Sequence, residues 1–291
     1  MIQRLKNENL IVMFDDEEVT LHEAIKYTVF PGGELNVSLN LSDRDANYYD
    51  NFRIYGTVKN SNDVMTIVMV KDILNTLGAS DVELCLTYMP YSRQDRVCHE
   101  GEAFSLKAFA RIINSLNFKK VITFDAHSDV TAAVFDNLQN VSQEYCVGIG
   151  HHIDDAFSKV DYVVAPDAGA LKKCIKNAEL FECGLLRADK QRDTNGEIIE
   201  TIIHNAEKMK DKSILITDDI IDGGKTVIEL VKLIKTYNPK LIQVYCTHGI
   251  FSNGTQCLFD AGIDKLITTD SYCINDSTDH LKIIKLKGTI S

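Results

Sequence analysis

The sequence predicts an α/β protein of two domains, each with a mainly parallel β-sheet flanked by helices. Short apolar runs rich in β-branched and aromatic residues recur along the chain, and we expect each to lead into a helix. The length, 291 residues, exceeds what one hydrophobic core usually serves. The expected strands are residues 9–14, 52–57, 82–88, 120–124, 161–165, 213–217 and 240–246.

Two sets of apolar residues follow the i, i+3, i+4, i+7 spacing of a buried helix face. They are Val70, Ile73, Leu74 and Leu77, and Val227, Leu230, Val231 and Ile234. Turns are expected at residues 31–33, 194–196 and 223–224, which are rich in glycine, proline and asparagine. Residues 140–157 form the least periodic long segment, so we predict domains 1–145 and 146–291.

Composition narrows the classes of partner. The formal net charge is −11, from 31 Lys and Arg against 42 Asp and Glu, which excludes a sequence-independent nucleic-acid binder. An anionic ligand therefore has to be held by backbone amides, metal ions and a few placed cations. The eight cysteines form no CxxC pair, and no apolar run reaches about 20 residues. We expect a soluble cytoplasmic protein with reduced thiols and no membrane partner.

The strongest motif is a pair of acids followed by a glycine turn. Asp218 and Asp219 end the apolar run 213–217, and Asp222-Gly223-Gly224-Lys225-Thr226 leads into the second helical pattern. Two carboxylates can accept hydrogen bonds from a vicinal diol, while turn amides and a helix N-terminus hold a phosphate. A ribose 5-phosphate presents both groups. The alternative is that the acids only cap a helix, although one acid would suffice for that.

Residues 214–226 resemble the phosphoribosyl pyrophosphate signature of type I phosphoribosyltransferases and of ribose-phosphate pyrophosphokinases, which share their fold. A second segment, residues 90–96, resembles the ATP-binding segment of the pyrophosphokinases, which the transferases lack. The resemblance implies two phosphoribosyltransferase-like domains, with ATP on the first and the sugar phosphate on the second. The ATP-binding residues it implies in this segment are Arg93, Gln94, Asp95 and Arg96.

Further segments match the same family in the same order. Residues 124–129 are similar to its D-x-H segment, which implies that His127 helps to hold Mg·ATP. Residues 163–170 are similar to the segment whose aspartate, here Asp167, binds a second Mg²⁺, although Ala170 replaces a glycine. Residues 151–155, with two histidines and two aspartates, imitate a metal site, but we interpret them as a solvated loop.

Two more resemblances concern assembly and catalysis. Residues 30–34 look like the loop whose Phe30 and Glu34 reach the adenine of a neighbouring subunit's ATP, which implies a dimer or a higher homo-oligomer. Residues 190–192 resemble the mobile catalytic loop, so that Lys190 and Arg192 are expected to stabilise the transition state. Without the family resemblance, the same residues would be interpreted as an ordinary charged hairpin tip.

The resemblance implies transfer of a pyrophosphoryl group from Mg·ATP to the C1 hydroxyl of ribose 5-phosphate, with Asp218, Asp219 and Thr226 orienting the sugar phosphate. One departure is Lys225, since the family loop normally reads D-T-x-G-T. A substituted acceptor such as ADP-ribose therefore remains an alternative. A phosphoribosyltransferase and an inactive regulatory homologue are further alternatives. The chain is also shorter than typical members at both ends, which leaves assembly and allostery open.

Overall fold

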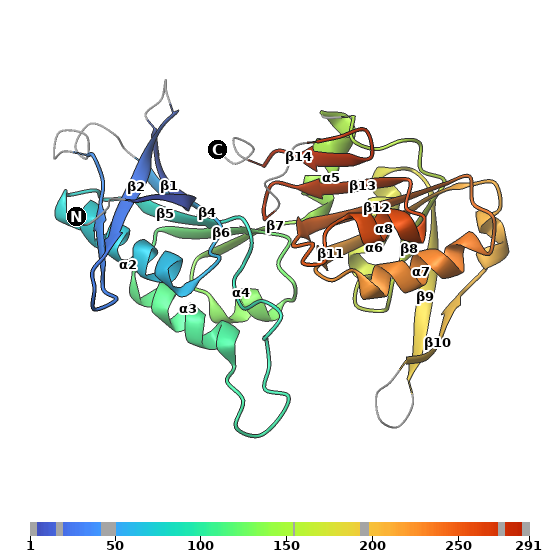
Figure 1. Ribbon diagram of the computed structural model, residues 1–291, viewed down its shortest axis with the longest axis horizontal. Coiled ribbons are helices and arrows are strands. Elements are labelled where there is room, and N and C mark those ends of the chain that lie inside the picture. Colours follow the sequence, from blue (N-terminus) through green and yellow to red (C-terminus); the bar gives the residue numbers. More distant parts are fainter. Residues whose placement is uncertain are drawn as a thin grey trace. The chain divides into compact units, whose positions relative to one another are not determined.

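The structure, a computed structural model, describes residues 5–15, 20–41, 51–153, 155–192, 198–272 and 277–286. It divides into two compact units, Met1–Val141 and Ser142–Ser291. Within the described residues, each unit contains a seven-stranded sheet with helices packed against it (Figure 1). The predicted α/β class is therefore confirmed.

The sheet of the first unit has parallel and antiparallel parts. Its strand order is β3-β2-β1-β4-β5-β6-β7, and β4 to β7 are parallel. The predicted run 9–14 lies in β1 but leads into an antiparallel strand, β2, and not into a helix. The strands are β1 (Leu5–Asp15), β2 (Thr20–Val29), β3 (Leu35–Ser38), β4 (Asn51–Gly56), β5 (Val82–Leu86), β6 (Lys120–Phe124) and β7 (Leu138–Val141).

In the described part of this unit, three helices cover the sheet: α2 (Ser61–Thr76), α3 (Ser105–Ser115) and α4 (Val130–Val134). Helix α2 begins at a capping box, in which Asn60 and Asp63 each accept a hydrogen bond from the other's backbone amide. The predicted face of α2 is confirmed, because Val70 and Leu74 are fully buried in the core of the unit.

The sheet of the second unit is parallel apart from one edge strand. Its order is β10-β9-β8-β11-β12-β13-β14, and only β10 runs antiparallel to its neighbour. Parallel strands buried on both faces are consistent with the nearly continuous apolar sequence of β11 and β12. The strands are β8 (Tyr162–Ala165), β9 (Gly184–Arg192), β10 (Ile198–Ile203), β11 (Ser213–Ile221), β12 (Leu241–Gly249), β13 (Lys265–Thr269) and β14 (Leu281–Ile284).

The helices of the second unit are α5 (Gln143–His152), α6 (Leu171–Leu180), α7 (Lys225–Lys235) and α8 (Gln256–Ala261), with a short 3₁₀ turn η1 (Ala206–Met209). The predicted face of α7 is buried, as Val227, Leu230, Val231 and Ile234 are at most 3% exposed. None of the helices in the described part of the chain combines the length and the apolar character that crossing a membrane requires.

Helix α5 occupies the segment that lacked sequence periodicity. It begins at Ser142, whose Oγ accepts a hydrogen bond from the Tyr145 amide, so the division between the units falls just before it. The boundary expected from sequence, between residues 145 and 146, falls inside this helix. Two glycines weaken its pattern, and one of them, Gly150, is needed because a Cβ there would meet Ile284 at 2.3 Å.

The second sheet contains a topological switch point. Strand β8 lies between β9, which follows it directly in sequence, and β11, which starts the succession β11, β12, β13 and β14 in the opposite direction. Ligands of open α/β sheets bind outside the carboxyl ends of the strands at such a point. The loops that follow β8 and β11 are therefore where a ligand site is expected.

Candidate functional site

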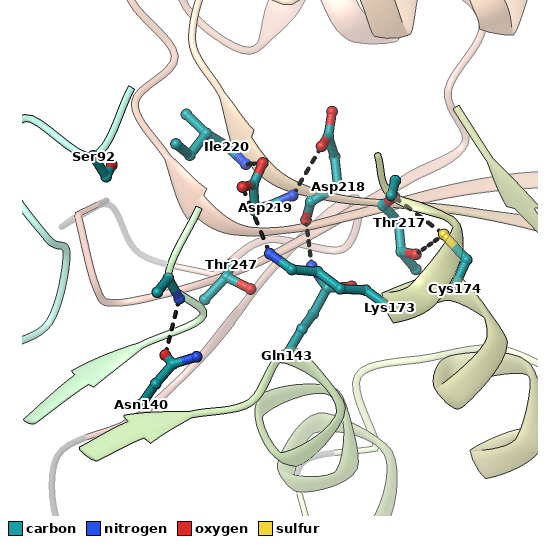
Figure 2. Close-up of polar contacts among 12 residues, drawn as sticks. Ser92, Asn140, Gln143, Lys173, Cys174, Thr217, Asp218, Asp219, Ile220 and Thr247 are labelled. Atoms are coloured by element: carbon teal, nitrogen blue, oxygen red, sulfur yellow. Dashed lines mark hydrogen bonds and ion pairs between the residues drawn. The ribbon is translucent and has the colours of Figure 1, made fainter. Parts of the chain in front are cut away.

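The acid pair lies at the carboxyl end of β11, next to the switch point. Each carboxylate accepts a hydrogen bond from the following amide: Asp218 Oδ1 from Asp219 N at 2.9 Å, and Asp219 Oδ1 from Ile220 N at 2.8 Å (Figure 2). Lys173 Nζ, from α6, lies 3.6 Å from Asp219 Oδ2. The pair is thus held at the end of a buried strand, with one cation beside it.

The electrostatics of the pair favour one shared proton. Burial, the charge of Asp219 and, further away, the charge of Asp167 raise the pKa of Asp218 to about 8. Two adjacent carboxylates seldom ionise together in a partly desolvated place. At neutral pH the substrate-free pair therefore carries one proton and can both donate and accept hydrogen bonds.

The predicted glycine turn follows β11 and opens α7. Gly224 is the N-cap of α7, with φ of 78°, a conformation that favours glycine. A Cβ at Gly224 would also lie 2.8 Å from Leu258 Cδ2. Lys225 and Thr226, the first residues of the helix, are exposed. The turn therefore presents helix amides and a cation, which is an arrangement that binds phosphate.

The helix-capping alternative is excluded for the acid pair. The N-cap of α7 is Gly224, which has no side chain to bond the first amides, so neither Asp218 nor Asp219 caps the helix. Asp222 and Gly223 lie between the pair and the cap, and Asn253 Nδ2 donates to Gly223 O at 3.2 Å. The turn is thus fixed by a neighbouring loop and leaves the carboxylates for another role.

Asp167 lies in the loop between β8 and α6, across the switch point from the acid pair. Its Oδ1 accepts a hydrogen bond from Ala170 N at 3.1 Å, and its charge contributes to the raised pKa of Asp218. Carboxylate oxygens suit Mg²⁺, which is usually bound by one or two carboxylates together with substrate phosphates. In the described residues no three His, Cys, Asp or Glu side chains group as a metal site, so a metal here would also need ligand oxygens.

Lys190, Gln191 and Arg192 lie at the end of β9, where this strand pairs with β10 in an antiparallel ribbon. Their backbone is thus a strand, and the loop form expected from sequence is wrong for them. Figure 1 shows this ribbon extending beyond the helices of its unit. The orientation of their side chains and the expected turn at residues 194–196 lie outside the described residues.

In the first unit, the 90–96 segment follows β5 and its arginines are exposed. Arg93, Gln94 and Arg96 face solvent, whereas Asp95 is 8% exposed. Burial would raise the pKa of Asp95, but its neighbours Ser128 and Arg96 outweigh this effect and lower it. Asp95 is therefore an ionised structural anchor of the loop, and the arginines are the groups available to a polyanion.

His127 lies on the loop after β6, the strand next to β5, so the two loops share one edge of the first sheet. The loop turns at Asp125, which is buried and has φ of 41°. Asn140 Oδ1 accepts a hydrogen bond from Ala126 N at 2.9 Å (Figure 2). His127 itself is exposed, and its charge is felt by Asp95.

The predicted turn at residues 31–33 is confirmed as the tip of the β2–β3 hairpin. Gly33, with φ of 93°, donates to Phe30 O at 2.8 Å, and Phe30 N donates to Glu34 O at 2.8 Å. Phe30 is 38% exposed, and Glu34 is exposed as well. The hairpin thus presents an aromatic ring and a carboxylate to the surroundings of its unit.

The loop interpretation of residues 151–155 is wrong for the two histidines, which end helix α5. The His151 ring lies 4.7 Å from the Phe181 ring, and burial followed by the charge of His152 lowers the pKa of His151. His151 and Asp155 line a cavity of about 570 Å³. Residue 154 lies outside the described residues, and no metal grouping occurs among the residues that are described.

Three residues near the acid pair were not identified from sequence: Lys173 and Asn177 of α6, and Gln143 of α5. Gln143 Nε2 donates to Asp218 O at 3.0 Å, and Asn177 Nδ2 donates to Gln143 Oε1 at 2.8 Å. Lysine and asparagine in an amphipathic helix are usually solvated. Only the i, i+4 spacing of Lys173 and Asn177 pointed to a common face, and nothing in sequence linked it to β11.

Comparisons with known proteins agree with this geometry. Residues 9–116 match the N-terminal domain of ribose phosphate pyrophosphokinase, and residues 148–273 match the phosphoribosyl transferase domain. A ribose-phosphate pyrophosphokinase of Methanobrevibacter smithii is 32% identical over 226 residues, covering 74% of this chain and 75% of that protein. One from Mycoplasma genitalium is 29% identical over 259 residues, covering 89% and 76%.

A solved structure supports the same fold. The phosphoribosylpyrophosphate synthetase of Mycobacterium smegmatis matches with a TM-score of 0.74 and 22% identity, covering 90% of this chain and 86% of that one. The carboxyl-edge acids, the glycine turn and both domain matches lead to one assignment: the chain belongs to the ribose-phosphate pyrophosphokinase family.

Proposed function

We propose that this enzyme transfers the β,γ-pyrophosphoryl group of ATP to the C1 hydroxyl of ribose 5-phosphate, giving phosphoribosyl pyrophosphate and AMP. The observation that carries the proposal is the acid pair of β11 followed by the uncapped glycine N-terminus of α7, at the switch point of the sheet. Membership of the pyrophosphokinase family supports the reaction type.

Asp218 and Asp219 bind the ribose hydroxyls in this proposal. One shared proton lets the pair accept a hydrogen bond from one hydroxyl and donate one to its neighbour. The amides of Asp222, Gly223 and Gly224, with Lys225 and Thr226, bind the 5′-phosphate. The exposed side of this turn leaves room for that group.

The first unit binds the nucleotide. Arg93 and Arg96 contact polyphosphate oxygens, and Phe30 stacks on an adenine with Glu34 as a hydrogen-bond acceptor. His127, in the first unit, and Asp167, in the second, are residues that would each hold Mg²⁺, with substrate phosphate oxygens as further ligands. When bound, Mg²⁺ neutralises charge on the phosphate oxygens.

In the transfer, the C1 hydroxyl oxygen forms a bond to the β-phosphorus. The bond from that phosphorus to the oxygen bridging to the α-phosphorus breaks, AMP leaves with the electron pair, and the hydroxyl proton is released. Negative charge builds up on the equatorial oxygens, where Lys190 and Arg192 stabilise it. Positioning and charge neutralisation supply most of the catalysis.

We also infer self-association as a dimer or higher homo-oligomer in the cytoplasm. Exposed Val29 and Phe30 at the β2–β3 hairpin form an apolar tip that suits a contact with a second copy. Buried thiols in the reduced form at Cys85, Cys146, Cys174 and Cys246 suit a reducing compartment. Light scattering on the purified chain measures the assembly, and a monomer at micromolar concentration contradicts it.

The test is AMP release from Mg·ATP with ribose 5-phosphate as the acceptor. We expect AMP and phosphoribosyl pyrophosphate in equal amounts, and no reaction without Mg²⁺. An inactive regulatory homologue gives no AMP with any acceptor. A phosphoribosyltransferase consumes phosphoribosyl pyrophosphate and a base without needing ATP. Asp218→Asn should raise the KM for the sugar phosphate more than the KM for ATP, and equal effects exclude Asp218 from the sugar site.

ADP-ribose is a second candidate acceptor, which the exposed Lys225 supports. Its ammonium group lies at the first position of α7, where a second phosphate beyond the 5′-phosphate would meet a cation. The same assay with ADP-ribose in place of ribose 5-phosphate decides between the acceptors by the ratio of kcat/KM values. Lys225→Thr should shift that ratio toward ribose 5-phosphate if the lysine binds the second phosphate.

A further inference from the structure

The carboxyl end of β11 extends beyond its partner strand on one side. Pairing of β11 with β8 is recorded from Ile214 to Ile216, whereas pairing with β12 continues to Ile221. Asp218 and Asp219 therefore lie where the β8 side of the ladder has ended. At such a strand end, backbone groups that have no partner in the sheet can be hydrogen-bonded by side chains from neighbouring helices.

Helices α5 and α6 supply a chain of polar side chains at this strand end. Gln143 Nε2 donates to Asp218 O at 3.0 Å, and Asn177 Nδ2 donates to Gln143 Oε1 at 2.8 Å. Asn177 Nδ2 also lies 3.3 Å from Thr217 Oγ1, which is 3.2 Å from Cys174 Sγ. Figure 2 shows the Gln143 contact below Asp218 and the Cys174 contact with Thr217. We call Gln143 and Asn177 the amide brace.

The amide brace is not explained by stability alone. Asn177 is 0% exposed and Gln143 is 3% exposed, and within the described residues Asn177 Oδ1 has no hydrogen-bond partner. A buried, unpaired amide oxygen costs folding free energy, which partly offsets what the hydrogen bonds of Asn177 contribute. The polar side chain is therefore held at a cost, as is usual where a side chain positions a functional group.

The same helix also holds the other carboxylate of the site. Asp167 Oδ1 accepts a hydrogen bond from Ala170 N, at the N-cap of α6, at 3.1 Å. Two turns further along α6, Asn177 reaches β11 through Gln143 and Thr217. One rigid element thus connects Asp167 with the acid pair, so that a shift of α6 against β11 changes the distance between them.

We propose that Asn177 is a positioning residue for the sugar phosphate: through Gln143 it fixes the peptide of Asp218 and aims the acid pair at the ribose hydroxyls. This inference rests on the proposed function of the acid pair. In this proposal Asn177 does not contact the substrate. It acts through the position of the acid pair, because a small misplacement of a binding group weakens substrate binding strongly.

The experiment compares Asn177→Leu, Gln143→Leu and the double variant with the wild-type chain. We expect each single variant to raise the KM for ribose 5-phosphate about tenfold, a typical size for loss of an orienting hydrogen bond, with the KM for ATP unchanged. Leucine at residue 177 removes the donor to Gln143 Oε1, so the melting temperature of Asn177→Leu should fall modestly while the chain stays folded. The double variant should resemble the more damaging single variant, because both belong to one chain of contacts.

Ile175→Ala is the matched control, since Ile175 lies on the exposed face of the same helix and is 42% exposed. It should leave both KM values unchanged. An Asn177→Leu variant with wild-type KM values overturns the proposal, and so does an equal rise in both KM values. If Asn177→Leu does not fold, Gln143→Leu decides. Failure of both to fold shows a structural role and overturns the proposal.

Calorimetric titration with ribose 5-phosphate in the absence of ATP separates this inference from the proposed reaction. A wild-type chain that binds the sugar phosphate but releases no AMP refutes the reaction, and the affinities of the variants still test the brace. A wild-type chain that releases AMP while the variants bind as tightly as it does refutes only the brace. A wild-type chain that neither binds nor reacts refutes both.

Discussion

Lys173 Nζ lies 3.6 Å from Asp219 Oδ2, so the acid pair of β11 has a cation on the helix that also carries Asn177. The two side chains are 29% and 12% exposed, which makes this a partly desolvated pair. A nearby positive charge favours the ionised form of a carboxylate. Lys173 therefore helps the pair to keep one negative charge in the substrate-free enzyme.

Replacing Lys173 with methionine should move the acid limb of the activity profile to higher pH. Without the cation, the singly protonated pair takes up a second proton more readily, so a higher pH is needed to keep one negative charge on the pair. The measurement is kcat/KM for ribose 5-phosphate against pH. Lys172→Met is the matched control, since Lys172 is the exposed neighbour, and an identical profile for both variants contradicts the role of Lys173.

Asp218→Asn should become more stable relative to the wild-type chain as the pH rises. The pKa of Asp218 is raised from 3.8 to about 8, so between these values the native state keeps a proton that the unfolded state has lost. The contribution of Asp218 to the free energy of unfolding therefore decreases as the pH rises. This loss of stability grows until the pH passes about 8. Asparagine does not titrate, which removes that cost.

Thermal unfolding of the substrate-free chain without Mg²⁺ measures this difference. The melting temperature of Asp218→Asn minus that of the wild type should increase between about pH 5 and about pH 8, a range that lies between the pKa values of Asp218 in the unfolded and the folded chain. Asp211→Asn, at an exposed position, is the control for loss of a surface carboxylate. A difference that is constant with pH would mean that Asp218 ionises in the folded chain as it does in the unfolded one.

Gly224→Ala should destabilise the chain and weaken phosphate binding. Alanine at φ of 78° is strained, and its Cβ would meet Leu258 Cδ2 at 2.8 Å. We expect a loss of about 1–3 kcal/mol in unfolding free energy, measured in urea. Gly254→Ala is the control: Gly254 has φ of 73°, but a Cβ there meets nothing within 4 Å. Equal losses would mean that the contact with Leu258 adds nothing.

Lys190→Ala should lower kcat at least about a hundredfold with little effect on folding, the scale of losing one charge donor in the transition state. Its backbone lies in the β9–β10 ribbon, opposite Thr201, so truncation leaves the strand pairing in place. Single-turnover AMP formation measures the effect. Lys208→Ala, at an exposed residue of η1, controls for loss of a surface charge. Unchanged turnover for Lys190→Ala removes it from catalysis.

Local patterns in the sequence determined the framework of both units. The apolar runs predicted strands β4, β5, β6, β8, β11 and β12, because buried parallel strands need continuous apolar residues. The heptad-like spacing predicted the buried faces of α2 and α7. The acid pair and glycine turn were also visible in sequence, since strand, acids, turn and helix are contiguous there.

Features that depend on partners distant in sequence were decided by the tertiary structure alone. Strands β1 and β2 pair antiparallel, and β9 with β10 forms a ribbon, because pairing is set by neighbours that periodicity does not reveal. The same holds for Gln143, Asn177 and Lys173, because their contacts join separate elements: the contact of Gln143 with Asp218 spans 75 positions, and that of Asn177 with Thr217 spans 40. The sequence thus determined which groups the site contains. The packing of α5 and α6 on β11 decided the positions of these groups, because a buried amide is placed only by the elements that enclose it.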